Sequence, residues 1–254
     1  MKVPVVVIGL GEMGRVFASG LLRAGYPVYP VTRDMDLSRE SSLIPGPEVV
    51  LVAVGDRSLD GVLEALPESW RGRTCLLQNE LLPGDWRDRQ IVRPTVISVW
   101  FEKKPGRPIR RILRSPVYGP KAGLVIEALG AIDIPAVEVA EAAEMQYEMV
   151  RKNLYILTAN IAGLATGGTV GELWRDHRAL AREVAGEVLD IQQWLLREDL
   201  PRERVLNGML EAFQADPDHE CVGRSARERL QRMVRLADRA GLAAQRLRRI
   251  EASV

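Results

Sequence analysis

The chain opens on a short apolar run that leads directly into a glycine-rich turn. Residues 5–8 read VVVI, and Gly9, Gly11 and Gly14 follow with the spacing G-x-G-x-x-G. After this turn, apolar residues recur at the intervals of one helix face, at Met13, Val16, Phe17, Leu21 and Leu22. A buried strand that turns through glycines into a helix favours the first unit of a parallel α/β sheet, and no other feature constrains the fold as strongly.

Each glycine of this turn has its own physical task. Gly9 lets the chain turn sharply out of the strand, Gly11 lets the backbone approach a pyrophosphate, and Gly14 lets the helix pack close to the sheet. The free N–H groups at the start of the helix favour the negative charge of the phosphates. The sequence therefore predicts a dinucleotide site formed by Gly9, Leu10, Gly11, Glu12, Met13 and Gly14.

The end of the second predicted strand distinguishes the two nicotinamide dinucleotides. An NAD site normally has an acidic residue there, which accepts hydrogen bonds from the ribose. This chain reads VTRD at residues 31–34, so a strand that ends at Val31 or Thr32 places the Arg33 guanidinium and the Thr32 hydroxyl where they can bind a 2′-phosphate. We therefore predict NADP. Asp34 keeps NAD open, because a shift of one residue would bring its carboxylate to the ribose.

The hydrophobic pattern changes near residue 140. Before it, five short runs are apolar throughout, as in strands buried on both faces: VPVVVIG, YPVYPVT, EVVLVAV, RTCLLQN and PTVISVW. After Glu141, glycine and proline become rarer and long amphipathic stretches follow. We predict a Rossmann-type doubly wound parallel sheet in residues 1–140, followed by an all-α domain in residues 141–254 that serves substrate binding and dimerisation.

Charge and cysteine content narrow the classes of partner. The chain has 35 basic and 34 acidic residues, so no net field favours nucleic acid or a membrane surface, and we expect neither as a partner. It contains no stretch of eighteen apolar residues. Cys75 and Cys221 lack the spacing of metal ligands, so we expect no metal site and a reducing compartment. Because the N-terminal pattern is not that of a cleaved leader, we expect the cytoplasm.

Several short segments of the sequence, in this order along the chain, resemble segments of a known family. They read GLGEMG at 9–14, VTR at 31–33, LLQNELLPG at 76–84, MVRKNLYILTANIAGL at 149–164 and GEL at 171–173. Together they resemble the ketopantoate reductases, which are relatives of the 6-phosphogluconate dehydrogenase-like enzymes. The resemblance implies an NADP-binding Rossmann domain, a helical C-terminal domain and reduction of the ketone of a branched 2-keto acid.

The resemblance also implies roles for individual residues. The family carries Lys-x-x-x-Asn-x-x-x-Asn on the first long helix of its second domain, where the lysine is the general acid that protonates the carbonyl oxygen. Lys152 matches the lysine and Asn160 the second asparagine, whereas the first asparagine falls on Ile156. Helical spacing places these three positions on one face. Asn79 matches a residue at a strand end that helps to place both the nicotinamide and the lysine.

Further positions depart from the family pattern. Eleven residues beyond Met209, at a distance where the family has a Thr-Glu pair that contacts substrate, this chain has His219 and Glu220. Glu220 is therefore a candidate substrate contact. The serine that precedes the methionine is Gly208 here, and the family's LQNG ends in Glu80.

These departures affect the predicted substrate and leave a second reading open. Loss of hydrogen-bonding groups at positions 156 and 208 disfavours ketopantoate itself, so we predict NADPH-dependent reduction of a less polar keto acid, an aldehyde or an imine. A non-catalytic NADP-binding sensor or scaffold remains an alternative, as does another member of the wider superfamily with a substrate of its own. The apolar residues Trp194, Leu195 and Leu196 near a helix end are consistent with a homodimer.

Overall fold

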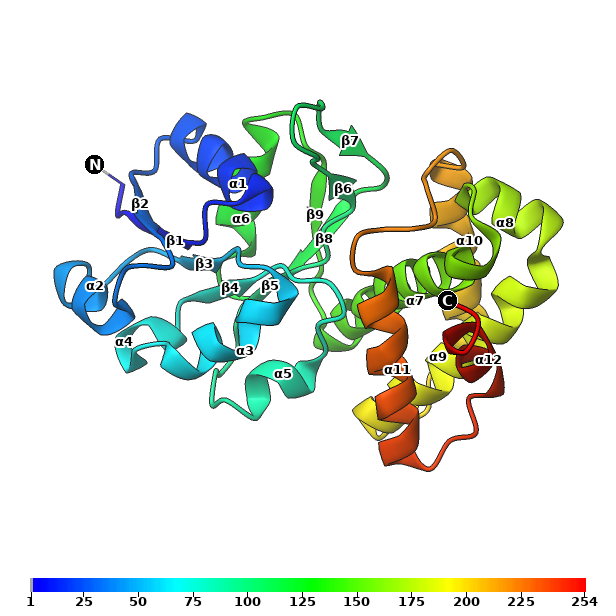
Figure 1. The fold of residues 1–254 in the computed structure, drawn as a ribbon. Coiled ribbons are helices and arrows are strands. Elements are labelled where there is room, and N and C mark those ends of the chain that lie inside the picture. Colours follow the sequence, from blue (N-terminus) through cyan, green and yellow to red (C-terminus); the bar gives the residue numbers. More distant parts are fainter. Residues whose placement is uncertain (1) are drawn as a thin grey trace. The chain divides into compact units, whose positions relative to one another are not determined.

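The computed structural model describes residues 2–254 and contains two compact units, divided between Glu148 and Met149 (Figure 1). The first unit contains a sheet with helices, and the second is built from helices alone. The division falls within helix α7, Ala142–Thr166.

The five apolar runs form the five neighbouring parallel strands of a seven-stranded sheet, so their prediction is confirmed. Their order in space is β2-β1-β3-β4-β5. The strands are β1 (Val5–Ile8), β2 (Val28–Val31), β3 (Val50–Val52), β4 (Thr74–Leu76) and β5 (Thr95–Ile97). All residues of β1 and β3 are buried, as expected for strands with helices on both faces.

The position of β2 at the edge of the sheet has a local cause. Pro30 lies in β2 opposite Val7 and has no backbone N–H to give to a further strand, and proline in sheets is largely confined to edges. The chain passes from β1 to β2 on one side and then crosses to β3 on the other side of β1. The strand order therefore reverses between β1 and β3, which is where ligands bind in open α/β sheets.

Among the described residues of the first unit, the helices before α7 are α1 (Glu12–Arg23), α2 (Leu37–Leu43), α3 (Asp56–Ala65), α4 (Glu68–Arg71), α5 (Pro83–Arg87) and α6 (Ala122–Gly130). The predicted helix is confirmed as α1, which buries Phe17 and Leu21 and leaves Leu22 exposed. Consecutive helical residues point about 100° apart, and a neighbour of Leu21 can therefore face solvent. Gly20 brings α1 against α6, since a Cβ there would lie 2.3 Å from the Ala128 carbonyl oxygen.

The last two strands of the sheet do not continue the parallel order of the first five. Strand β8 (Ser115–Tyr118) pairs with β5 in the antiparallel direction, whereas β9 (Ala136–Glu138) is parallel to β8. Between β5 and β8 the chain forms the small antiparallel pair β6 (Phe101–Glu102) and β7 (Arg110–Arg111) instead of a crossover helix. Parallel pairing needs such a crossover, which α6 provides between β8 and β9.

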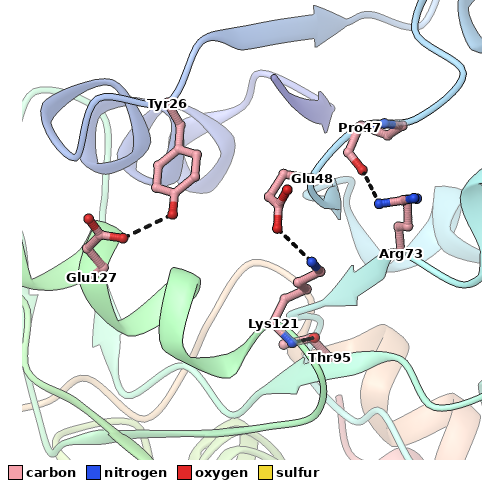
Figure 2. A network of polar contacts seen from close by, with 7 residues as sticks. All are labelled: Tyr26, Pro47, Glu48, Arg73, Thr95, Lys121 and Glu127. Atoms are coloured by element: carbon pink, nitrogen blue, oxygen red, sulfur yellow. Dashed lines mark hydrogen bonds and ion pairs between the residues drawn. The ribbon is translucent and has the colours of Figure 1, made fainter. Parts of the chain in front are cut away.

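Polar contacts connect residues along one edge of the sheet, the edge at which the parallel strands begin (Figure 2). This edge is here called the amino edge. The Lys121 amine forms a 2.6 Å ion pair with Glu48, just before β3, and the Lys121 backbone N–H donates to the Thr95 hydroxyl at 2.9 Å. Arg73, which precedes β4, donates to the Pro47 carbonyl oxygen at 2.9 Å. Side chains thus connect the starts of three strands and the loop after β8.

The second unit confirms the all-α prediction. After α7 come α8 (Val170–Asp176), α9 (Arg178–Leu196), α10 (Arg202–Ala215), α11 (Ala226–Ala240) and α12 (Gln245–Glu251) (Figure 1). The GEL segment at the start of α8 has a folding role, because Glu172 and Thr169 form a reciprocal capping box. Of the helices formed by residues 2–254, none is both long and apolar enough to cross a membrane.

Candidate functional site

The glycine turn lies at the carboxyl end of β1, beside the point where the strand order reverses. Gly9 has φ +94°, a region that only glycine adopts readily, and a Cβ there would lie 2.9 Å from the Ala53 carbonyl oxygen. Its N–H donates to Val31 O at 2.9 Å, and the Ala53 N–H donates to Ile8 O at 2.8 Å. Neighbouring strands on both sides therefore hold this turn close to the backbone after β3.

The other two glycines of the turn differ sharply from each other. A Cβ at Gly14 would lie 2.0 Å from the Gly9 carbonyl oxygen, so a side chain there is incompatible with the turn. A Cβ at Gly11 would meet nothing within 4 Å, and this residue is exposed. Gly11 is the N-cap of α1 and supplies no side-chain hydrogen bond, so the first N–H groups of the helix can bind an anion.

A second helix also begins at this edge of the sheet without a side-chain cap. Gly55 follows β3 and is the N-cap of α3, again with no side-chain hydrogen bond. Sequence reasoning missed this residue, although a glycine directly after an apolar strand and before a helical pattern was a usable signal. Helices α1 and α3 thus both begin at the carboxyl edge of the sheet on glycine.

The segment after β2 places Thr32 and Arg33 at the same edge. Strand β2 ends at Val31, and the Met35 N–H donates to the Thr32 carbonyl oxygen at 3.1 Å, which closes a turn. Arg33 and Asp34 lie at the tip of this turn, and both are exposed. The strand therefore ends where the prediction for Arg33 requires, with Asp34 beside it.

The end of β4 contributes Asn79 and a second polar residue that sequence reasoning missed. The buried Gln78 amide donates to Val52 O at 2.6 Å and to Val54 O at 3.3 Å, so it ties the end of β4 to the end of β3. A polar residue closing an apolar run was the available signal. Asn79 follows, half-buried, in a turn. Glu80 has φ +62°, so the backbone keeps the left-handed conformation that favours glycine although the glycine is absent.

Helix α7 places Lys152, Ile156 and Asn160 on one face, as predicted. Only 7% of Lys152 and 8% of Asn160 is exposed, and Ile156 between them is half-buried. Lysine is rarely buried to this degree, since its charge must then be met by protein groups. The burial distinguishes Lys152 from an ordinary solvated lysine of an amphipathic helix.

The Asn160 side chain bonds to two protein groups. Its Nδ2 donates to the Cys221 carbonyl oxygen at 2.8 Å, and its Oδ1 accepts from Arg229 Nη1 at 2.7 Å. Arg229 lies on α11, is only 8% exposed, and was missed by sequence reasoning. Its position was a signal, because 229 falls on the same helix face as the buried Ala226 and Met233.

Glu220 lies in a segment whose backbone is held on both sides. It forms an isolated antiparallel bridge with Thr169, flanked by hydrogen bonds from Val170 N to His219 O and from Cys221 N to Gly168 O, both 2.9 Å. The Glu220 side chain is exposed. The structure thus brings this segment next to Asn160 through the Cys221 carbonyl.

Comparisons with known proteins agree on the fold. The chain is 14% identical to 2-dehydropantoate 2-reductase from Methylococcus capsulatus, with a TM-score of 0.70 over 98% of this chain and 94% of that one. A PanE/ApbA family ketopantoate reductase from Ralstonia eutropha is 17% identical, with a TM-score of 0.67 over 98% and 96%. The chain has the fold of the ketopantoate reductases. No protein-family model and no curated protein matches its sequence.

The ketopantoate reductase fold also occurs in a solved complex of D-mandelate dehydrogenase with NADH. That structure is 11% identical to this chain, with a TM-score of 0.65 over 98% of this chain and 96% of that one. The matches of Asn79, Lys152 and Asn160 to the family pattern stay predictions from the sequence, as do the departures at Glu80, Ile156 and Gly208. The Gly208 carbonyl oxygen accepts a 2.9 Å hydrogen bond from Arg151 Nε, so the backbone at this position is engaged within the second unit.

The two cysteine thiols of the chain are shielded by burial. Burial raises the pKa of the Cys75 thiol to about 12 and that of Cys221 to about 11, so both thiols stay protonated at neutral pH. Over residues 2–254, no group of three or more His, Cys, Asp or Glu side chains is arranged to hold a metal ion.

Proposed function

We propose that the protein is an NADPH-dependent reductase of a small keto acid or related carbonyl compound. The observation that carries this proposal is the carboxyl edge of the sheet, where α1 and α3 both begin on glycine beside the reversal of strand order. This is the place and the chemistry that a dinucleotide pyrophosphate requires. The fold shared with 2-dehydropantoate 2-reductase and D-mandelate dehydrogenase supports an oxidoreductase.

The residues present fit a nicotinamide dinucleotide. The open space at Gly11 leaves room for a pyrophosphate against the first N–H groups of α1. The exposed Arg33 guanidinium and the Thr32 hydroxyl would bind a 2′-phosphate, which favours NADPH over NADH. When bound, the reduced nicotinamide supplies the hydride that reaches the carbonyl carbon.

Lys152 is the proposed general acid. As the carbonyl carbon accepts hydride, negative charge develops on its oxygen, and Lys152 Nζ donates the proton that completes the hydroxyl group. The burial of Lys152 limits the access of water to its amine. In the same proposal, Asn79 helps to place the nicotinamide, Asn160 holds its face of α7 in position, and the exposed Glu220 carboxylate contacts the substrate.

Ile156 narrows the proposed substrate. It lies on the same face of α7 as Lys152 and Asn160, and an apolar side chain there cannot bond to a hydroxyl of the substrate. A site that has lost such a partner favours a less polar molecule. We therefore place a keto acid with an apolar side chain, an aldehyde or an imine ahead of ketopantoate.

A second candidate is a non-catalytic NADP-binding sensor or scaffold. The observation that favours it is the state of Asn160, whose amide already bonds to the Cys221 carbonyl and to Arg229. An amide engaged in this way has less hydrogen-bonding capacity for a substrate.

Titration separates these functions. Protein fluorescence would be followed during addition of NADPH and NADH, and nicotinamide absorbance during addition of 2-keto acids, aldehydes and imines. Tight NADPH binding with turnover supports the reductase, whereas tight binding without turnover over the whole panel supports the sensor. A preference for NADH would instead indicate that the Asp34 carboxylate, and not Arg33, binds the ribose of the coenzyme.

A variant pair tests the role of Lys152. We expect Lys152→Met to lower kcat by about 100-fold or more while the Kd for NADPH changes less than about twofold, because only proton transfer is lost. Lys104→Met, in the turn after β6, is the matched control and should keep wild-type turnover. Wild-type kcat in Lys152→Met would remove the lysine from the mechanism.

We also propose a homodimer formed through the end of α9. Trp194 and Leu195 are exposed there, which is unusual for two adjacent large apolar residues. One of the solved structures of this fold is a dimeric ketopantoate reductase from Staphylococcus aureus. Light scattering after size exclusion should give twice the chain mass, and Leu195→Glu should shift it to the monomer.

A further inference from the structure

A groove of about 540 Å³ runs along the exposed side of α1 in the first unit. The α1 side chains Arg15, Ser19 and Arg23 form one wall, and Lys103 and Ile109 of the β6–β7 segment and Ile132 after α6 line the rest. Its volume is in the range of pockets that bind small organic molecules. The coenzyme role proposed above uses none of these six residues, although Glu12 of the glycine turn also lines the groove.

The α1 wall carries two cations in a line. Arg15, Ser19 and Arg23 are spaced four residues apart and therefore share one helix face, with about 12 Å of helix rise between the two arginines. All three are exposed. Across residues 2–254, neither guanidinium group makes a hydrogen bond or an ion pair with the protein. Each therefore has its full set of donors available to a ligand.

The opposite wall holds a third cation in a fixed position. Lys103 Nζ donates to the carbonyl oxygens of Lys104 at 3.1 Å and Arg107 at 2.5 Å, which anchors the amine on the turn of the β6–β7 hairpin. It also lies 3.6 Å from a Glu12 carboxylate oxygen, so the acidic charge at this end of the groove is balanced by Lys103.

Between the cations, the groove is apolar. Ile109 and Ile132 are half-buried and pack against the core of the first unit, so they are fixed in place and partly accessible. Guanidinium groups bind carboxylates and phosphates through paired hydrogen bonds, and apolar side chains favour a hydrocarbon between such groups.

We propose that this groove binds a small organic dianion in which an apolar chain separates two carboxylate or phosphate groups. One anionic end pairs with Arg15 and the other with Arg23, and the chain lies against the two isoleucines. The groove meets the glycine turn at Glu12, but both arginines follow the turn along α1, so we expect the ligand and the coenzyme to bind together.

Isothermal titration calorimetry with linear dicarboxylates tests this inference. Decanedioate, whose length spans the two arginines, should bind to the NADPH-saturated protein at least about tenfold more tightly than butanedioate, which is too short, or octanoate, which has one charge. Arg15→Gln and Arg23→Gln should each weaken decanedioate binding about tenfold, since each removes one charge-assisted pair. Arg114→Gln, at another exposed arginine of the same unit, is the control and should bind as the wild type does.

Three results would overturn the inference. The first is an absence of heat with decanedioate, and the second is an affinity that Arg15→Gln and Arg23→Gln leave unchanged or that Arg114→Gln lowers equally. The third is displacement of decanedioate by NADPH together with loss of binding in Arg33→Gln, which would place the anion in the proposed coenzyme site. Melting temperatures of the variants confirm that each is folded, as expected because all four substituted arginines are exposed.

Discussion

The two edges of the sheet in the first unit are built in opposite ways. At the amino edge, charged and polar side chains such as Lys121, Glu48 and Thr95 bond to one another and to the backbone (Figure 2). At the carboxyl edge of β1 and β3, the residues are Gly9, Ala53 and Gly55, and two helices begin there without a side-chain cap.

The difference shows how one sheet separates stability from binding. Hydrogen bonds and ion pairs between side chains at the amino edge use polar groups within the protein, so few donors or acceptors are left there for a ligand. Small residues at the carboxyl edge expose backbone N–H groups whose partner must come from outside. Variants at the amino edge should therefore alter stability alone, and variants at the carboxyl edge should alter binding.

The largest effect is expected for Gly14→Ala. The added Cβ would lie 2.0 Å from the Gly9 carbonyl oxygen, so the turn must open. We expect a loss of about 3 kcal/mol in the free energy of unfolding in urea, and loss of NADPH binding in a fluorescence titration.

Gly11→Ala is the matched variant for this turn, because its Cβ meets nothing within 4 Å. It should change the free energy of unfolding by less than about 1 kcal/mol and still weaken NADPH binding, since a methyl group then enters the pyrophosphate space. Equal losses of stability in the two variants would contradict this account of the turn.

Thr95→Val tests the amino edge. It removes the acceptor of the Lys121 N–H and should lower the free energy of unfolding by about 1 to 2 kcal/mol, with an unchanged Kd for NADPH. Thr95→Ser keeps the hydroxyl and should recover most of the loss. A weaker affinity for NADPH in Thr95→Val alone would show that the two edges are coupled.

Glu80→Gly should stabilise the carboxyl edge. Relief of the left-handed conformation at φ +62° outweighs the extra chain entropy of glycine, so we expect a gain of about 0.5 to 1 kcal/mol in chemical unfolding. Gln90→Gly, at another left-handed residue with φ +57°, should give a similar gain without any change in NADPH affinity. A loss of stability in Glu80→Gly would mean that contacts of the Glu80 side chain outweigh the strain.

The smallest effect concerns a surface contact of α6 that depends on pH. Hydrogen bonds from Lys2, at 2.7 Å, and from Tyr26, at 3.0 Å, lower the pKa of the Glu127 carboxyl group. Figure 2 shows the bond from Tyr26. The contribution of these bonds to stability is therefore present above the ordinary pKa of glutamate and is lost as the pH falls through the lowered value.

Glu127→Gln should accordingly melt slightly below the wild type at pH 7, and the difference should disappear as the pH falls through the lowered pKa of Glu127. NADPH affinity at pH 7 should not change. A melting difference that persists at the lowest pH would mean that the charge of Glu127 is not its cause.

Much of this fold could be predicted from local sequence. The features that could not be predicted depend on contacts between segments that are distant in the sequence. The five apolar runs identified five strands because burial on both faces leaves a continuous signal along the chain. The antiparallel direction of β8 was not predicted, because it depends on whether a helix or a hairpin connects β8 to β5. Gln78 was missed because its partners, the carbonyl oxygens of Val52 and Val54, belong to another strand.

The candidate site divides in the same way. The sequence by itself determined the glycine turn, the end of β2 near Arg33, and the placement of Lys152 and Asn160 on one helix face, because each depends on neighbours within one or two turns of chain. Only the tertiary structure decided that Lys152 is buried and that Asn160 bonds to Arg229, 69 residues away. Such contacts depend on how separate helices pack against each other. The periodicity of apolar residues predicts which face of a helix is buried, but it does not predict which other helix covers that face.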